Sequence, residues 1–400
     1  MKSFTRQGLF IFLIICFSTI LSAQNVIIIV VDGARWSETF GGGNTYIPHI
    51  YDDMMPLGTL FTNYRIDYPS GYTETCPGHS AIESGTWQPI ANNGSERPHR
   101  PTIFEYARKE DGYVQSDCYA VTGKSKLNIL TYSDYSGYGS AFGGSWVGDD
   151  NKNDSQTFAK VISTMQTYHP KILVINFAEV DAIGHTGNWT NYLNAIKNVD
   201  TYVYQLWQHV QAGDYGYTTS NTTLFLTNDH GRHDDAHGGF TNHGDGCEGC
   251  EHIMLLALGR DVQANQVLDI AAWQIDIAPT VGELLDFQTP LAIGNSLLDN
   301  LTSVSYEENF HSLSEYKLEQ NYPNPFNPST KISYKIPTSG NVSLKIINLL
   351  GSEVTELINS EMEPGQYDIE FNAANLPSGV YFCRLQAGDF VQTRKMILLK

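Results

Sequence analysis

Runs of consecutive apolar residues alternate along the chain with stretches in which apolar residues recur every three or four positions. The first run is NVIIIVVDG at 25–33, and similar runs occupy 171–177 and 222–227. Such runs are typical of strands buried on both faces of a parallel sheet. Apolar steps of four and three predict amphipathic helices at 155–168 and within 191–210. This order predicts an α/β fold: a doubly wound, mostly parallel sheet with helices on both faces and sites at the carboxyl ends of its strands.

The pattern changes near residue 302. Beyond about residue 320 the helical periodicity disappears, and short segments of alternating apolar and polar residues follow one another, separated by turn residues. This pattern is typical of a small all-β sandwich. We therefore predict one domain at 24–302, a polar linker at 303–319 and a β-domain at 320–400.

The first 23 residues have the pattern of a secretory signal peptide. Lys2 and Arg6 precede a short apolar run, and Leu-Ser-Ala at 21–23 forms a small-residue cleavage site before Gln24. The run is short for a membrane-spanning helix, and no later segment is apolar enough to be one. The mature chain is expected to be soluble and exported, without a transmembrane segment.

Composition excludes one class of partner. The chain has 24 lysine and arginine residues against 43 aspartate and glutamate residues, a formal net charge of −19. Nucleic-acid binding needs clustered basic residues, so no nucleic-acid-binding surface is expected. Five cysteines remain after the signal peptide, and export permits disulfides, but the sequence does not give their connectivity. They are Cys76, Cys118, Cys247, Cys250 and Cys383.

Acidic side chains and histidines follow each of the three apolar runs. Asp32 ends the first run, Asp181 and His185 follow the second, and Asp229 and His230 follow the third. A single aspartate after a strand is usually a turn or cap residue. Three such positions, two with a nearby histidine, favour a site for zinc or a similar divalent ion.

A hydroxyl-bearing segment, YTETCPGHSAIESG at 72–85, precedes a helical pattern. A hydroxyl at a helix N-terminus lies where a developing alkoxide or a bound oxyanion is stabilised. A metal ion would lower the pKa of that hydroxyl further. Taken alone, the segment fits a simple threonine cap equally well.

Together these segments resemble the alkaline phosphatase superfamily, on the side of the nucleotide pyrophosphatase/phosphodiesterases and the phosphate-irrepressible alkaline phosphatases. Six pieces occur in the family order across roughly 25–299: VVDG, TCPGH, VDAIGH, NDHG, NHGD and DIAPTVGELLD. The resemblance implies two zinc ions, or other divalent cations in their place. One ion would take Asp32, Asp229, His230 and the nucleophile Thr75, and the other would take Asp181, His185 and His243.

Two of these assignments have alternatives. Cys76 is next to Thr75, but the sulfatase motif Cys-x-Pro-x-Arg is not matched by Cys-Pro-Gly-His, so Thr75 is preferred, as it is over Thr73. His237 also precedes a glycine, yet His243 is nearer the apolar strand that follows this ligand in the family.

The other histidines and acids of 227–252 are not expected to be zinc ligands. His233 and His252 are interpreted as surface or outer residues. Cys247 and Cys250 have metal-like spacing, but a zinc knuckle needs a second ligand pair, and none stands in a clear pattern. A local disulfide is an equal alternative.

The resemblance also implies residues that contact the substrate. The family places an asparagine a short helix beyond the nucleophile, where this chain offers Asn92 or Asn93. Lys124 and Lys126 occupy a segment in which the monoesterase branch has a lysine and an arginine. Lysine cannot bind a phosphoryl group bidentately, so this departure weakens the assignment to monoesters.

The end of the chain resembles the C-terminal sorting domain of the type IX secretion system. The matching segments are 318–337, with the run PNPFNP, and 380–400. The resemblance implies recognition by that secretion machinery and export through the periplasm of a bacterium with two membranes, to the surface or medium. An ordinary accessory β-domain is the alternative.

These inferences predict a secreted two-zinc hydrolase of small phosphate esters that acts through a phospho-threonine on Thr75. Two alternatives use the same site: a phosphodiesterase or nucleotide pyrophosphatase, and a sulfate or phosphonate ester hydrolase. A third is a secreted binding protein without catalytic activity.

Overall fold

The computed structural model describes residues 25–302 and most of 316–399, leaving out 319–320, 322, 337–338, 350–351, 363–364 and 389. The chain divides into two compact units, residues 1–302 and 303–400. The predicted signal peptide and most of the predicted linker lie outside the described residues. In the described part of the chain, no helix has the length and apolar character needed to cross a membrane.

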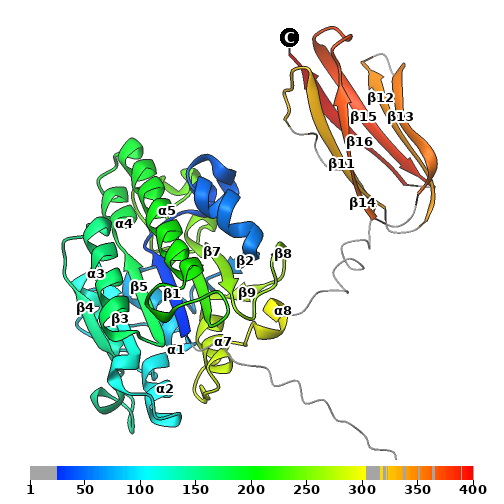
Figure 1. The fold of residues 1–400 in the computed structure, drawn as a ribbon. Coiled ribbons are helices and arrows are strands. Elements are labelled where there is room, and N and C mark those ends of the chain that lie inside the picture. The colour runs from blue at the N-terminus through cyan, green and yellow to red at the C-terminus, as the bar shows by residue number, and fades with distance from the viewer. Residues whose placement is uncertain are drawn as a thin grey trace, which may run out of the picture. The chain divides into compact units, whose positions relative to one another are not determined.

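The first unit is built on one nine-stranded sheet, ordered β4-β3-β5-β1-β6-β7-β2-β8, with β9 also paired to β2 (Figure 1). Neighbours from β4 to β6 are parallel, whereas β7 is antiparallel to both β6 and β2. The predicted α/β class, with a mostly parallel sheet, is therefore confirmed. The strands are β1 Asn25–Val31, β2 Gly58–Arg65, β3 Cys118–Thr122, β4 Ser145–Gly148, β5 Ile172–Phe177, β6 Thr222–Thr227, β7 His252–Gly259, β8 Gln266–Leu268 and β9 Ala272–Trp273.

Helices cover both faces of this sheet, as predicted. In β1, Ile27 and Ile29 face a core shared with α3 and α5, whereas Val26 and Ile28 face a core shared with α1, α2 and α7. Both sets are fully buried, which explains why the strand is apolar at every position. The helices are α1 Thr75–Ser84, α2 Ile103–Glu110, α3 Asp154–Tyr168, α4 Glu179–Gly184, α5 Trp189–Ala212, α6 Glu248–Glu251, α7 Ile277–Leu284 and α8 Leu298–Thr302.

Strand pairing fixes where the predicted acidic loops meet. β1 lies between β5 and β6, with Val30 opposite both Asn176 and Thr227. The three strands are parallel, so their carboxyl ends emerge side by side at one edge of the sheet. The segments that follow β1, β5 and β6 therefore converge, although they are about 150 and 200 residues apart in the chain.

The second unit consists of two antiparallel sheets, β10-β11-β14 and β13-β12-β15-β16. Inward-facing apolar residues from both sheets, such as Ile332 and Leu344, share one core, as predicted for a sandwich. Lys317 and Leu318, at the end of the predicted linker, instead form β10. The strands are β10 Lys317–Leu318, β11 Ser329–Ile336, β12 Gly340–Asn348, β13 Glu353–Met362, β14 Gly365–Asn372, β15 Gly379–Ala387 and β16 Phe390–Leu398.

Candidate metal centre and active site

The ends of β1 and β6 bring Asp32, Asp229 and His230 together, all fully buried. His230 Nε2 lies 3.7 Å from Asp32 Oδ1 and 3.6 Å from Asp229 Oδ2. Asp229 Oδ1 accepts from the backbone N–H groups of Gly33 and His230, which fixes the orientation of the carboxylate. Three of the four predicted ligands of the first ion therefore face one another across the ends of two adjacent strands.

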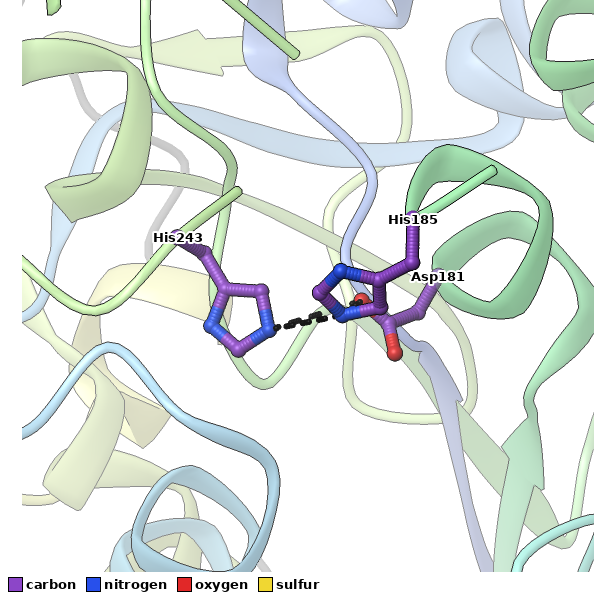
Figure 2. A group of neighbouring side chains, drawn as sticks. All are labelled: Asp181, His185 and His243. Carbon is purple, nitrogen blue, oxygen red and sulfur yellow. Dashed lines mark hydrogen bonds and ion pairs between the residues drawn. The ribbon is translucent and has the colours of Figure 1, made fainter. Parts of the chain in front are cut away.

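The second predicted ligand set also converges (Figure 2). Asp181 and His185 are one turn apart at α4, and His185 Nε2 lies 3.3 Å from Asp181 Oδ1. His243 comes from the loop before β7, and its Nε2 lies 3.2 Å from His185 Nε2 and 3.6 Å from Asp181 Oδ1. Its Nδ1 donates to the carbonyl of Thr73, which leaves Nε2 directed at the other two ligands.

The two sets adjoin each other. Asp181 groups with His185 and His243 and also with Asp32 and His230, each time with ligand atoms within 4.8 Å of one another. The rings of His230 and His243 stack with centroids 3.9 Å apart. The structure thus places six donor side chains around one small volume.

Lys124 joins the two sets. Its buried ammonium donates to Asp32 Oδ1 at 2.8 Å and to Asp181 Oδ2 at 2.7 Å. It also lies 3.3 Å from Thr75 Oγ1. Burial acts to lower the pKa of Lys124, but the surrounding carboxylates, Asp32 first, raise it above its ordinary value, so the amine is charged.

Thr75 is the first residue of α1 and is 1% exposed. The neighbouring Thr73 directs its hydroxyl elsewhere, to the carbonyl of Asp245. Cys76 packs in an apolar cluster with Ile90 and Leu127, and burial raises the pKa of its thiol to about 11. Of the three nucleophile candidates, Thr75 is therefore the one whose hydroxyl lies next to the ligand sets.

The two candidate asparagines occupy different positions. Asn92 Oδ1 accepts from the N–H of Cys76 and from Lys126 Nζ, both at 2.9 Å. Asn93 is exposed, and its side chain accepts from the N–H of Ser95. Asn92 is thus held against the start of α1, one residue from Thr75.

A cavity of about 610 Å³ opens beside these residues. This volume lies within the range of small-molecule sites. Three lysines contribute to the wall, including Lys152, which the sequence reasoning missed. The lining residues are Asn93, Lys124, Ser125, Lys126, Asp150, Lys152, Asp181, Ala182 and His185.

Sequence reasoning also missed two buried residues that support the ligands. Asn176, the polar residue inside apolar β5, donates to Asp32 Oδ2 at 2.9 Å. Arg232 is fully buried and donates to Asp181 Oδ1 and to the carbonyls of Phe240 and Thr241. The only sequence signal for Asn176 was that it is an isolated polar residue in an apolar run. The only signal for Arg232 was that it is a charged residue directly after Asp-His-Gly.

The donor chemistry fits a divalent metal. Burial lowers the pKa of His230 to about 3 and that of His243 to about 4, so both imidazoles are neutral at neutral pH, as metal ligands must be. Burial alone would raise the pKa of Asp181, but Lys124 and neighbouring cationic groups hold it well below its usual range. Among the described residues, Asp229 Oδ2 and His230 Nε2 are buried without a hydrogen-bond partner, although His79 Nδ1 lies 3.2 Å from that oxygen. A buried acceptor in this state is costly unless a cation pairs with it.

Sequence comparison matches this region to known families. Residues 122–289 match the family described as the metalloenzyme superfamily, and residues 320–399 match the secretion system C-terminal sorting domain. The chain therefore contains an alkaline phosphatase/metalloenzyme superfamily domain, followed by a C-terminal sorting domain. The sorting domain of this metalloenzyme is of the type IX system and indicates export across the outer membrane.

Curated relatives match only part of this metalloenzyme. A 2,3-bisphosphoglycerate-independent phosphoglycerate mutase of Haloquadratum walsbyi is 30% identical over 139 residues. The match covers 34% of this chain and 26% of the mutase. The chain therefore spans about a quarter of the length of that relative.

Solved structures share the fold. A phosphonate monoester hydrolase from Silicibacter pomeroyi superimposes with a TM-score of 0.52 and 13% identity, covering 94% of this chain and 89% of the hydrolase. The alkaline phosphatase PafA superimposes with a TM-score of 0.50 and 12% identity, covering 70% of this chain and 99% of PafA. At these identities, the likeness concerns the fold of the metalloenzyme alone.

One expectation from the sequence needs correction. A second ligand pair does lie near the two cysteines of the 247–250 segment. Cys250 neighbours His233 and Asp245, and Cys247 neighbours Asp234 and His237. The sequence reasoning overlooked it because these histidines precede the cysteines by ten residues or more and lie beyond an intervening loop.

Proposed function

We propose that this metalloenzyme hydrolyses phosphate esters, with Thr75 as the nucleophile and two zinc ions bound by the two ligand sets. The observation that carries the proposal is the position of Thr75 Oγ1 at the N-terminus of α1. It lies 3.3 Å from the Lys124 ammonium, which itself contacts Asp32 and Asp181. The hydroxyl therefore stands at the junction of both sets.

Asp32, Asp229 and His230 would hold one ion, and Asp181, His185 and His243 would hold the other. Carboxylate and imidazole donors suit zinc, and three protein ligands per ion leave an exchangeable position. When bound, such ions lower the pKa of a nearby hydroxyl and offset charge on the attacking and leaving oxygens.

The side chains of the site would carry out the reaction in two steps. Thr75 Oγ attacks phosphorus as the bond from phosphorus to the alcohol oxygen breaks, which gives a phospho-threonine and an alcohol. Water then cleaves the phospho-threonine to inorganic phosphate and free Thr75. The N-terminus of α1 lies where negative charge collects on the phosphoryl oxygens, and the Lys124 ammonium lies beside the attacking oxygen of Thr75.

Asn92 is the better candidate for an additional phosphoryl contact. Its side-chain oxygen is engaged by Cys76 and Lys126, so its amide N–H groups are left to donate. The cavity wall carries Lys126 and Lys152, which favours a small anionic substrate.

A diester or phosphonate monoester is the second candidate substrate. Lys124 is committed to two carboxylates, and Lys126 donates to the carbonyl and side chain of Asn92. Neither lysine ammonium is therefore free to pair with the second negative charge of a phosphate monoester. No arginine lines the described part of the cavity. A substrate with a single negative charge places less demand on such a site.

The test compares hydrolysis of aryl phosphate monoester, diester and sulfate by the zinc-loaded wild type, Thr75→Ala and Thr73→Val. We expect Thr75→Ala to lose at least about 10³-fold in kcat, while Thr73→Val keeps most of its activity. Acid-quenched wild type should gain the mass of one phosphoryl group on the peptide that contains Thr75. Full activity of Thr75→Ala would exclude Thr75 as the nucleophile, and the ratio of rates identifies the preferred ester.

A further inference from the structure

A second cluster of metal-type donors lies in the segment between β6 and β7, outside the two catalytic sets. Its first group contains Cys250, His233 and Asp245, with ligand atoms within 4.8 Å of one another. Its second group contains Cys247 and His237, together with Asp234, at the same spacing. The side chains of Cys247 and Cys250 also interact, so the two groups adjoin each other.

We propose that Cys247, Cys250, His233 and His237 hold a third metal ion, a zinc of structural type. In the sequence, the two histidines have the spacing His-x₃-His and the two cysteines have the spacing Cys-x₂-Cys. Both spacings are those of structural Cys₂His₂ zinc sites. Two thiolates and two imidazoles are also the donors that select zinc over magnesium or calcium.

The state of the side chains supports the same assignment. Cys250 is 0% exposed and Cys247 is 6% exposed, and both are free thiols rather than a disulfide. In the described part of the chain, His233 Nε2 is buried without a hydrogen-bond partner, with Asp245 Oδ2 at 3.3 Å. His237 Nδ1 donates to Asp234 Oδ1 at 2.7 Å. A carboxylate on one ring nitrogen is the usual outer partner of a metal-bound imidazole.

The backbone around the cysteines is shaped to hold them. The carbonyls of Gly249 and Cys250 accept from the N–H groups of Arg232 and Gly231 at 2.9 Å. A Cβ atom on Gly249 would lie 2.4 Å from the carbonyl oxygen of Arg232, so only glycine permits this approach. The cysteine turn is thereby fixed against the segment that bears His233.

An ion at this position would fasten both ends of the loop that supplies catalytic ligands. His230 lies three residues before His233, and His243 lies between the histidine pair and the cysteines. Thr73 links the same region, because its hydroxyl donates to Asp245 and its carbonyl accepts from His243. The third ion would therefore maintain the loop without contacting the substrate.

Cobalt substitution tests the proposal independently of catalysis. The two catalytic sets contain only oxygen and nitrogen donors, so only the third site can give thiolate-to-cobalt charge-transfer absorption. We expect the full wild-type chain to bind three cobalt ions and show this absorption. Cys250→Ser should lose the absorption and one ion, whereas Thr75→Ala should lose hydrolysis but keep both.

A second variant distinguishes loss of the third ion from misfolding of the protein. The His237 side chain is 53% exposed, so His237→Asn should fold normally and still release cobalt from the third site to a chelator at least about tenfold more readily. His49→Asn, at a similarly exposed histidine outside the loop, should match the wild type. Absence of thiolate-to-cobalt absorption in the wild type, a mass showing a Cys247–Cys250 disulfide, or unchanged cobalt retention in His237→Asn would each overturn the proposal.

Discussion

Arg232 offers a direct measure of how much energy supports the candidate site. Its guanidinium is fully buried and serves three acceptors: Asp181 Oδ1 and the carbonyls of Phe240 and Thr241. Gly184 makes room for it, since a Cβ atom there would lie 2.6 Å from Arg232 Cζ. Removing one partner of a buried ion pair costs about 3–5 kcal/mol. Two carbonyls left without donors cost about 1 kcal/mol or more each.

We therefore expect Arg232→Met to lower the free energy of unfolding of the metal-free first unit by about 5 kcal/mol. Arg232→Lys should recover less than half, because one ammonium cannot reach three acceptors in a fixed plane. Arg65→Met is the matched control, since the Arg65–Glu248 pair is partly exposed and should contribute no more than about 1 kcal/mol.

Urea titration followed by tryptophan fluorescence measures this difference in the first unit alone, because all six tryptophans lie between residues 36 and 273. Zinc affinity, measured by competition with a chromogenic chelator, should fall about 10–100-fold in Arg232→Met, as expected for a residue that orients a ligand. If Arg232→Met and Arg65→Met unfold at the same urea concentration, the buried network does not carry the stability assigned to it.

Three further changes probe other buried groups. Lys124→Met should lower the free energy of unfolding of the chelator-treated protein by about 3 kcal/mol. Zinc should restore most of this loss in thermal melts, because a divalent cation replaces the lost positive charge. A loss of stability that zinc does not change would contradict this account. Burial raises the pKa of Asp154 to about 8, so stability should fall by up to about 1.4 kcal/mol per pH unit between about pH 4 and pH 8 as the unfolded chain ionises first. Asp154→Asn should remove that slope in urea titrations across the same pH range, and an unchanged slope refutes the assignment. Glu83 is buried, and burial raises the pKa of its carboxyl group. Neither of its oxygens has a hydrogen-bond partner within the described residues, so Glu83→Leu should raise the Tm. A lower Tm would show that the carboxyl group stabilises the fold.

Helices and strands whose positions follow from hydrophobic periodicity could be predicted from the sequence. The helix within 191–210 is the amphipathic α5, and the strand at 222–227 is β6, because a buried face imposes its period on the sequence. The antiparallel insertion of β7 between β6 and β2 was not predictable, because an apolar run carries no sign of its direction.

Residues of the candidate site could likewise be predicted where the signal is local in the sequence, and not where it depends on tertiary contacts. Asp181 and His185 were identified as candidates because they follow a recognisable strand and lie in a family motif, VDAIGH. Arg232 and Asn176 were missed because their roles depend on which segments fold against them, and that information lies in tertiary contacts. The ligand set proposed around Cys247 was missed for a similar reason, since the loop between its halves hides their proximity.

The central place of β1 in the sheet determines when a metal ion can be captured. β1 is the first strand to leave the ribosome, yet its neighbours β5 and β6 are completed only at residues 177 and 227, and His243 follows later still. Contacts this distant in sequence form slowly, because a long loop must close before any of them contributes. Neither ligand set exists in a nascent chain shorter than about 230 residues. If the two sets bind metal as proposed, we expect metal uptake to be a late step of maturation, after the sheet has formed.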